Sequence, residues 1–226
     1  MTRQTWLIAA LLGSVAITAC GGSRQAISTA PQPAPKIHGD SAAIANARPD
    51  SNRFPFTEAD VHFMTGMIHH HAQALSMARL APTNGAGRSL STLAARIINA
   101  QTDEIKLMQQ WLRDHGQPVP EPSPKGMKHT MGGEEHTMLM PGMITDEQMA
   151  KLEAARGMEF ETLFLTYMIQ HHQGALQMVK DLYATPGASQ DEKTFKLASD
   201  VFADQETEIE RMQKMLFTLK VEGRSP

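Results

Sequence analysis

The sequence contains only one cysteine, Cys20, and it lies in a segment that we expect to be an export signal. The folded domain therefore has no disulfide or thiolate metal site available, and any binding of soft metal ions falls to methionine and histidine. The formal net charge is −3, which indicates neither a nucleic-acid partner nor an acidic tail. Aromatic residues make up 5% of the chain, whereas methionine accounts for 16 of 226 residues, an excess that needs an explanation.

The apolar run near the amino terminus, residues 7–17, is too short to span a bilayer. Residues 1–20 instead fit an export signal with a positive start and a small-residue cleavage site. The stretch ITACG at residues 17–21 resembles a bacterial lipobox, in which Cys20 would be lipidated; an ordinary signal peptide with an incidental cysteine is the alternative. Residues 21–53 are rich in Ala, Ser, Pro and Gly and predict a flexible tether. We therefore expect an exported lipoprotein, anchored to a membrane on the periplasmic side of the bacterial cell envelope.

An internal repeat dominates the rest of the chain. Residues 67–77, MIHHHAQALSM, return 101 residues later as residues 168–178, MIQHHQGALQM. A helical period places each pair of histidines on an apolar face beside methionines. Two such helices facing each other would gather four imidazoles, whose burial is costly unless each finds a partner. A soft or borderline metal ion is a partner that imidazole and thioether share.

Capping signals and turns predict four helices. The first begins at Thr57 and ends before Pro82, and the second covers about 89–115. The third begins at Thr145, with a kink expected at Gly157, and the fourth ends near residue 219. Short connections make hairpins of residues 57–115 and 145–219, so we predict an all-α, ferritin-like four-helix bundle at 54–220, made of two tandem, sequence-related hairpins.

The second and fourth helices each carry a glutamine and a glutamate near the histidine layer. Gln101 and Gln205 lie on otherwise apolar stripes, where an imidazole N–H would provide a hydrogen-bond partner. We propose that these glutamines, together with Glu104 and Glu208, orient the histidine rings around a metal ion. A buried His–Gln network without any metal is the alternative.

The segment between the hairpins, residues 116–144, is too long for an idle connection. Its second half contains five methionines and two histidines. They are Met127, His129, Met131, His136, Met138, Met140 and Met143. Thioether and imidazole together suit Cu(I) or Ag(I), so we expect a flexible loop that collects these ions. A disordered linker whose methionines are accidental or pack on the bundle is the alternative.

The doubled motif resembles the signature of the DUF305 family, MIxHHxxA(I/L)xM, over residues 57–219. The resemblance implies a ferritin-like bundle, and some members of the family are periplasmic copper-binding proteins with a part in copper or silver tolerance. The ligand set that it implies consists of four residues in each copy: Met67, His70, His71 and Met77, and Met168, His171, His172 and Met178. Many members carry an acidic residue where Thr65 and Thr166 stand, so Asp60 and Glu161 are candidates to supply a carboxylate instead.

Three classes of function follow from these features. The leading prediction is a non-enzymatic protein that binds copper, as Cu(I) or Cu(II), or silver, for sequestration, buffering or tolerance. A di-iron oxidase is less favoured because no helix contains the Glu-x-x-His motif of such sites. The third is a structural or interaction lipoprotein with a metal-free core network. A homodimer that pairs the histidine helices of two chains fits the repeat as well as a monomer does.

Overall fold

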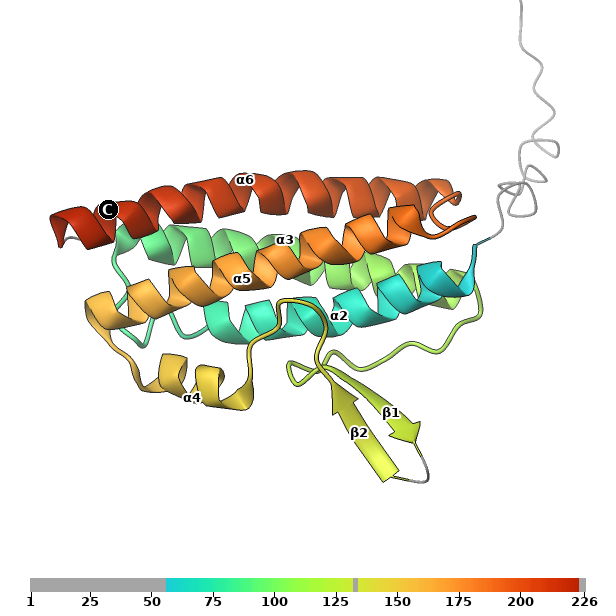
Figure 1. The fold of residues 1–226 in the computed structure, drawn as a ribbon, viewed down its shortest axis with the longest axis horizontal. Coiled ribbons are helices and arrows are strands. Elements are labelled where there is room, and N and C mark those ends of the chain that lie inside the picture. Colours follow the sequence, from blue (N-terminus) through green and yellow to red (C-terminus); the bar gives the residue numbers. More distant parts are fainter. Residues whose placement is uncertain (1–55, 132–133, 224–226) are drawn as a thin grey trace, which may run out of the picture. The chain divides into compact units, whose positions relative to one another are not determined.

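The computed structural model describes residues 56–131 and 134–223, which form a helical bundle (Figure 1). The four long helices are α2 (Glu58–Ala78), α3 (Arg88–Asp114), α5 (Gly157–Ala184) and α6 (Glu192–Glu222). Between the hairpins lie the antiparallel strands β1 (Met127–Met131) and β2 (Glu134–Met138) and the short helix α4 (Asp146–Ala154). The predicted all-α fold is confirmed. None of the described helices has the length and apolar character to cross a membrane, and the predictions for residues 1–20, with Cys20, and for 21–53 lie outside the described residues.

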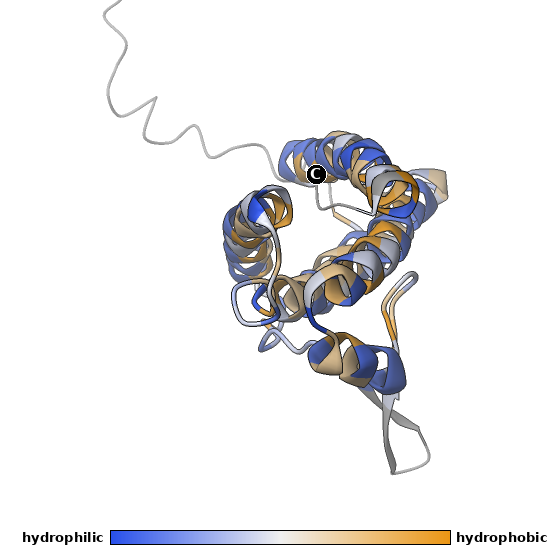
Figure 2. Ribbon diagram, turned by 90° about the vertical axis from the view of Figure 1, so that its left-hand side faces the viewer, coloured by the Kyte–Doolittle hydropathy of each residue, from blue (hydrophilic) through white to orange (hydrophobic). Residues whose placement is uncertain are grey.

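The bundle consists of two hairpins that meet through their first helices. Helix α2 packs along α3, and α5 packs along α6. The hairpins join where α2 and α5 run antiparallel (Figure 1), and side chains also pair across the other two helices, as Lys193 of α6 does with Asp114 of α3 at 3.2 Å. The view along the bundle shows the hydrophobic sides of the helices turned toward one another (Figure 2). Because the motif of each repeat lies in α2 or α5, the two motifs face each other.

Local capping explains where the helices begin. Thr57 accepts a hydrogen bond from the Asp60 backbone while the Asp60 carboxylate accepts one from Thr57, and Thr145 forms the same reciprocal box with Gln148. Asp191 caps α6 by accepting from the backbone N–H of Thr194 at 2.9 Å. Such caps satisfy backbone donors that the first turn of a helix leaves free. The capping boxes predicted at Thr57 and Thr145 are confirmed.

The third predicted helix is broken rather than kinked. Arg156 has extended backbone angles and Gly157 has a φ of +54°, so α4 and α5 are separate helices. Asn84, in the loop after α2, holds this break. Its side chain donates to the carbonyls of Leu152 at 3.2 Å and Ala155 at 3.0 Å, and its own carbonyl accepts from Gly157 at 2.8 Å. These bonds replace the helical ones that the break removes.

The segment between the hairpins is not an open, flexible loop in the described part of the chain. Residues 127–131 and 134–138 pair as the strands of a hairpin, and the following turn packs on the bundle. Met140 and Met143 in this turn are 4% and 5% exposed and belong to the hydrophobic core. The expectation that these two methionines lie in an open, flexible loop is therefore wrong, because the core provides a more apolar environment for them than water does.

Candidate metal centre

A layer of four buried histidines lies where α2 and α5 cross. His70 and His71 come from α2, His171 and His172 come from α5, and all four side chains are inaccessible to solvent. The rings of His70 and His171 lie against each other, with centroids 3.7 Å apart and planes inclined by 36°. Within each helix the two rings are more than 6 Å apart. The structure therefore brings together the four imidazoles that the repeat predicted to face one another.

The Nε2 atom of each ring faces an oxygen that can only accept a hydrogen bond. His70 Nε2 donates to the carbonyl of Pro141 at 3.0 Å, and His171 Nε2 donates to the carbonyl of His70 at 3.0 Å. His172 Nε2 donates to Glu208 Oε2 at 2.8 Å. His71 Nε2 lies at the same 2.8 Å from Glu104 Oε2, although the angle is poorer than in a full hydrogen bond. The last two contacts thus involve corresponding residues of the two repeats at the same distance.

These contacts determine which nitrogen of each ring is available to a ligand. A neutral imidazole has one N–H donor and one lone pair, so a proton held at Nε2 leaves the lone pair on Nδ1. The Nδ1 atoms of His70, His71, His171 and His172 are all buried and have no hydrogen-bond partner. In metal proteins the ligating histidine commonly donates its other ring N–H to a carboxylate or carbonyl, as here. The four lone pairs therefore suit a metal ion.

The two central rings are held in the neutral state. Burial lowers the pKa of His70 well below 6.5, and repulsion from His71 and His172 lowers this pKa further. Burial likewise lowers the pKa of His171 well below 6.5, with repulsion from the other three rings adding to it. A neutral imidazole is the form that binds a metal ion, so both rings are ready to do so at pH 7.

The glutamines predicted to orient the rings make no hydrogen bond to them. Gln101 and Gln205 are 2% and 3% exposed, and no nitrogen or oxygen of either side-chain amide has a hydrogen-bond partner. The expected His–Gln hydrogen bonds are therefore wrong. The contacts come instead from Glu104 and Glu208, three residues further along α3 and α6, whose carboxylates lie 2.8 Å from Nε2 of His71 and His172.

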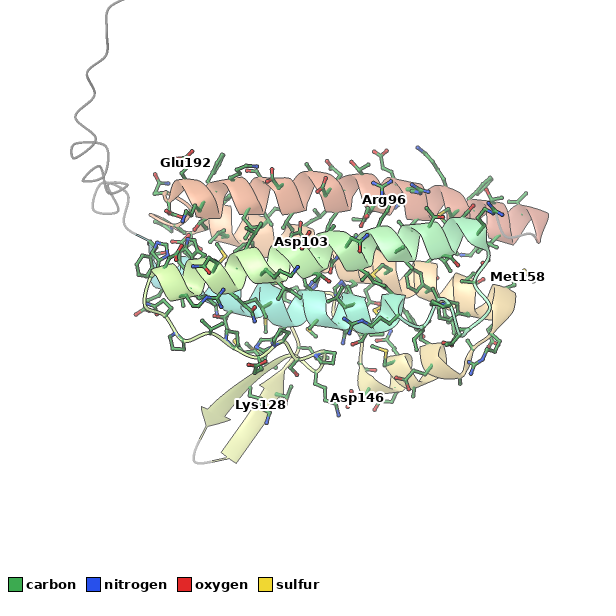
Figure 3. The ribbon with its side chains drawn as sticks, turned by 180° about the vertical axis from the view of Figure 1, so that it is seen from behind. Arg96, Asp103, Lys128, Asp146, Met158 and Glu192 are labelled. Atoms are coloured by element: carbon green, nitrogen blue, oxygen red, sulfur yellow. The ribbon has the colours of Figure 1, made fainter. Side chains whose placement is uncertain are left out.

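A polar crevice between α3 and α6 leads from solvent to these carboxylates. It has a volume of about 110 Å³, and its described lining includes Gln101, Glu104, Gln205, Glu208 and Asp204. Arg96, also in the lining, lies on α3 near α6 (Figure 3). Burial raises the pKa of Asp204, and repulsion from Glu104, Glu208 and Asp200 raises it further. The crevice is therefore a region of negative potential beside the histidine layer.

Asp60 and Glu161, the other predicted carboxylates, lie far from the histidines and fix loops instead. Asp60 Oδ1 accepts from the backbone N–H of Ser189, in the loop between α5 and α6, at 2.7 Å. Glu161 Oε1 accepts from Gly87, in the loop between α2 and α3, at 2.5 Å. Each hairpin thus anchors the loop of the other. Their expected role beside the metal is wrong, because ten residues of helix separate each from the first histidine, about 15 Å along the axis.

The methionines of the motif flank the histidine layer in two groups. Met67 and Met178 belong to the hydrophobic cluster around the first half of α2 and the second half of α5. Met77 and Met168 belong to the cluster around the opposite halves. All four are buried, with Met178 the most exposed at 8%. Because α2 and α5 are antiparallel, each group combines thioethers from both repeats.

The methionines and histidines of the segment 116–144 do not form one group. Met140 and Met143 lie in the same cluster as Met67, and Met127 packs against it. Met138 is 41% exposed. The side chains of His129, Met131 and His136 lie outside the described part of the structure.

No three His, Cys, Asp or Glu side chains converge closely enough to hold a metal ion within residues 56–131 and 134–223. The close contacts are pairwise, and they join His70 to His171, His71 to Glu104 and His172 to Glu208. A centre with three or more ligands at this layer therefore requires thioethers beside the imidazoles or a rotation of the rings on binding.

Sequence reasoning missed three residues that hold the inter-hairpin segment over the histidines. Gln73 accepts from the Ile144 N–H at 2.7 Å and donates to the carbonyls of Ile144 and Pro124 at 2.9 and 3.0 Å. His69 Nδ1 accepts from the Ser123 N–H at 3.2 Å. At Gly174 an added Cβ would lie 1.9 Å from the Pro141 oxygen. Gln73 could have been recognised from the sequence, because an amide on a buried helix face needs hydrogen-bond partners.

Comparison with known proteins identifies the family of the chain. The profile of the family "Domain of unknown function (DUF305)" matches residues 60–216. The chain belongs to the DUF305 family. A DUF305 protein from Streptomyces coelicolor is 30% identical, with a TM-score of 0.57, over 68% of this chain and 89% of that one. A DUF305 fragment from Deinococcus radiodurans is 31% identical, with a TM-score of 0.59, over 73% and 99% of the two chains.

A third similar structure is that of CopM in a Cu(II)-bound form. It is 28% identical, with a TM-score of 0.55, over 70% of this chain and 96% of CopM. CopM structures with Cu(I) and with Ag also match. No curated protein sequence matches the chain significantly. The family and the fold of this DUF305 protein are thus established, and its similar structures include one protein that binds copper and silver.

Proposed function

We propose that this DUF305 protein binds copper or silver ions at the histidine layer and holds them without catalysing a reaction. The observation that carries the proposal is the set of four buried Nδ1 atoms without partners. Three of these rings donate from Nε2 to an oxygen acceptor, and Nε2 of the fourth, His71, lies 2.8 Å from Glu104. A buried polar atom without a partner costs about 1–3 kcal/mol. A bound metal ion would offset that cost for each lone pair that it engages.

The donor set indicates the kind of ion. His70, His71, His171 and His172 offer neutral nitrogen ligands, and Met67, Met77, Met168 and Met178 offer thioethers on either side. Thioether and imidazole together favour Cu(I) and Ag(I), and imidazole alone also suits Cu(II), whereas hard cations favour oxygen. The bound forms of CopM, with Cu(I), Cu(II) and Ag, support this assignment. Glu104 and Glu208 would orient the outer rings from behind.

The metal-free alternative receives less support from the described residues. A structural His–Gln network requires hydrogen bonds between the imidazoles and the amides of Gln101 and Gln205. Neither amide has a partner, and the four Nδ1 atoms have none either. A network that left so many buried groups unpaired would destabilise the fold rather than specify it.

The expected place of action is the cell envelope. The export signal at residues 1–20 and the lipobox at Cys20 would put the bundle outside the cytoplasm on a lipid anchor. A relative from Streptomyces coelicolor is named as a secreted protein, which supports export. In that compartment, a protein that binds copper or silver tightly would lower the free concentration of these ions and thereby serve sequestration or tolerance.

Metal retention by the purified protein tests the proposal. After separate equilibration with Cu(I), Cu(II), Ag(I) and Zn(II) and removal of loosely held ions, we expect copper and silver to be retained in preference to zinc. The double substitution His70→Ala with His171→Ala should abolish tight binding while helicity measured by circular dichroism is kept. His115→Gln, at the end of α3, is the matched histidine control. Failure of the wild-type protein to retain any ion would contradict the proposal.

A further inference from the structure

A cavity of about 180 Å³ opens between the start of α2, the end of α5 and the turn that contains Met140. Four of its lining residues carry metal-binding groups: His62, Met140, Met178 and Asp181. His62 and Asp181 are exposed at the mouth, whereas Met140 and Met178 are 4% and 8% exposed and lie deeper. Among the described residues that line the cavity none is cationic. The cavity thus joins solvent to two thioethers.

The two thioethers converge because position 66 is glycine. A Cβ added at Gly66 would lie 3.0 Å from Met140 Sδ and 3.4 Å from Met178 Cε, so both side chains occupy the space that a side chain at 66 would take. The equivalent position in the second repeat is Tyr167, whose ring would fill such a space. His62 lies one helical turn before Gly66 and therefore projects from the same face of α2.

We propose that His62, Met140 and Met178 form a second, solvent-accessible site for a soft monovalent ion, Cu(I) or Ag(I), and that this site loads the buried layer. The inference rests on the proposed function of that layer. Two thioethers and one imidazole are a soft donor set that favours these ions over Zn²⁺ or Mg²⁺. The Asp181 carboxylate at the mouth attracts a cation and balances its charge.

The turn that carries Met140 links the two sites. Its next residue, Pro141, accepts the hydrogen bond from His70 Nε2 at 3.0 Å. An ion at Met140 and Met178 therefore lies one residue away from a group that holds a ring of the buried layer. This proximity favours transfer of an ion from the cavity to the histidines over independent binding at two distant places.

Ag(I) binding to the purified full-length chain tests the inference, with Ag(I) alone as the probe and equilibrium dialysis as the readout. We expect His62→Ala and Met140→Leu each to remove one Ag(I) per chain relative to wild type, and the double substitution to remove no more than either alone. Met158→Leu is the matched control, because Met158 is 54% exposed near the start of α5, far from the cavity (Figure 3). Equal counts and affinities in wild type and all variants would overturn the inference.

A further variant separates loss of the site from loss of the fold. Gly66→Ala introduces a residue of higher helix propensity, so the helix is retained, but its Cβ displaces the Met140 thioether. We expect weaker Ag(I) binding at the cavity and an unchanged buried site. If wild type retains no Ag(I), the proposed function has failed. If only the His70 and His171 substitutions reduce the count, the proposed function stands and the cavity site is refuted.

Discussion

Position 73 of the first repeat is glutamine, and its equivalent in the second repeat, position 174, is glycine. Gln73 binds the backbone of the inter-hairpin segment with three hydrogen bonds, whereas Gly174 gives that segment room to lie directly on α5. The outer histidines, by contrast, have corresponding partners in the two repeats. His71 with Glu104 and His172 with Glu208 pair at the same distance of 2.8 Å.

The comparison separates two kinds of position in the repeat. The histidines that are identical in both copies form the buried layer, in which the rings of His70 and His171 lie against each other across the α2–α5 contact. Gln73 and Gly174, which differ between the copies, each meet the single segment 116–144 in their own way. His70 Nε2 consequently binds the Pro141 carbonyl of this segment, while His171 Nε2 binds the backbone of α2. The shared histidines thus form one layer, while the segment 116–144 gives the two copies of the motif different surroundings.

We expect the largest loss of stability when position 174 of the second repeat receives the glutamine that the first repeat has at position 73. In Gly174→Gln the new side chain would collide with Pro141 and Gly142, whose backbone atoms lie within 2.6 Å of an added Cβ. We expect the free energy of unfolding to fall by about 3 kcal/mol or more, as for overpacked cores. Gln173→Ala, at the exposed neighbouring position, should change it by less than about 0.5 kcal/mol. Urea denaturation of both variants measures the difference, and equal stabilities would contradict the close contact.

Stability of the metal-free protein should depend on pH through one ring of each repeat. The pKa of His70 and of His171 is lowered well below 6.5 in the folded state, so below pH 6.5 the unfolded chain takes up protons that the folded chain does not. Full stability is therefore expected above pH 6.5, with a loss below it of up to about 1.4 kcal/mol per ring and pH unit.

Thermal unfolding between pH 5 and 8 measures this dependence. Replacing either ring by glutamine should halve the slope below pH 6.5, because each repeat contributes one of the two rings. A melting temperature that stays constant across this range would show that the rings are not buried in the neutral state.

Metal affinity should respond equally to the two equivalent carboxylates. Glu104→Gln and Glu208→Gln each remove the acceptor that orients one outer ring, and such losses typically weaken metal binding by about 10- to 100-fold. Asp103→Asn is the control, since Asp103 is exposed on α3 (Figure 3). Competition titrations with Cu(I) measure the affinities. A large effect from only one of the two substitutions would break the equivalence of the repeats at the site.

A smaller loss of stability is expected at Gln73, whose side-chain hydrogen bonds to the inter-hairpin segment have no equivalent at Gly174 of the second repeat. Gln73→Ala leaves the buried N–H of Ile144 without its acceptor, which should cost about 1–2 kcal/mol of unfolding free energy. The loss should also increase hydrogen exchange of residues near 144 without changing exchange in α6. Unchanged exchange near residue 144 would mean that the segment is held by other contacts.

The sequence predicted what periodicity and capping determine. Patterns within one element determine where helices begin, as at Thr57 and Thr145. Such patterns also led to the predicted hairpins and to the predicted pairing of the histidine helices. The Asn84 bonds that break the third helix, the burial of Met140 and Met143, and the loop-holding role of Asp60 were not predictable in this way. Each depends on which loop covers which helix face, and a periodic pattern shows that a face is buried but not what buries it.

The state of the imidazole nitrogens during Ag(I) titration tests the central claim most directly. Nitrogen-15 NMR of the histidine rings distinguishes Nδ1 from Nε2, and Ag(I) is diamagnetic. We predict that the Nδ1 resonances of His70, His71, His171 and His172 shift on binding while their Nε2 atoms remain protonated. Unshifted Nδ1 resonances at full Ag(I) occupancy, or binding through Nε2, would contradict the account.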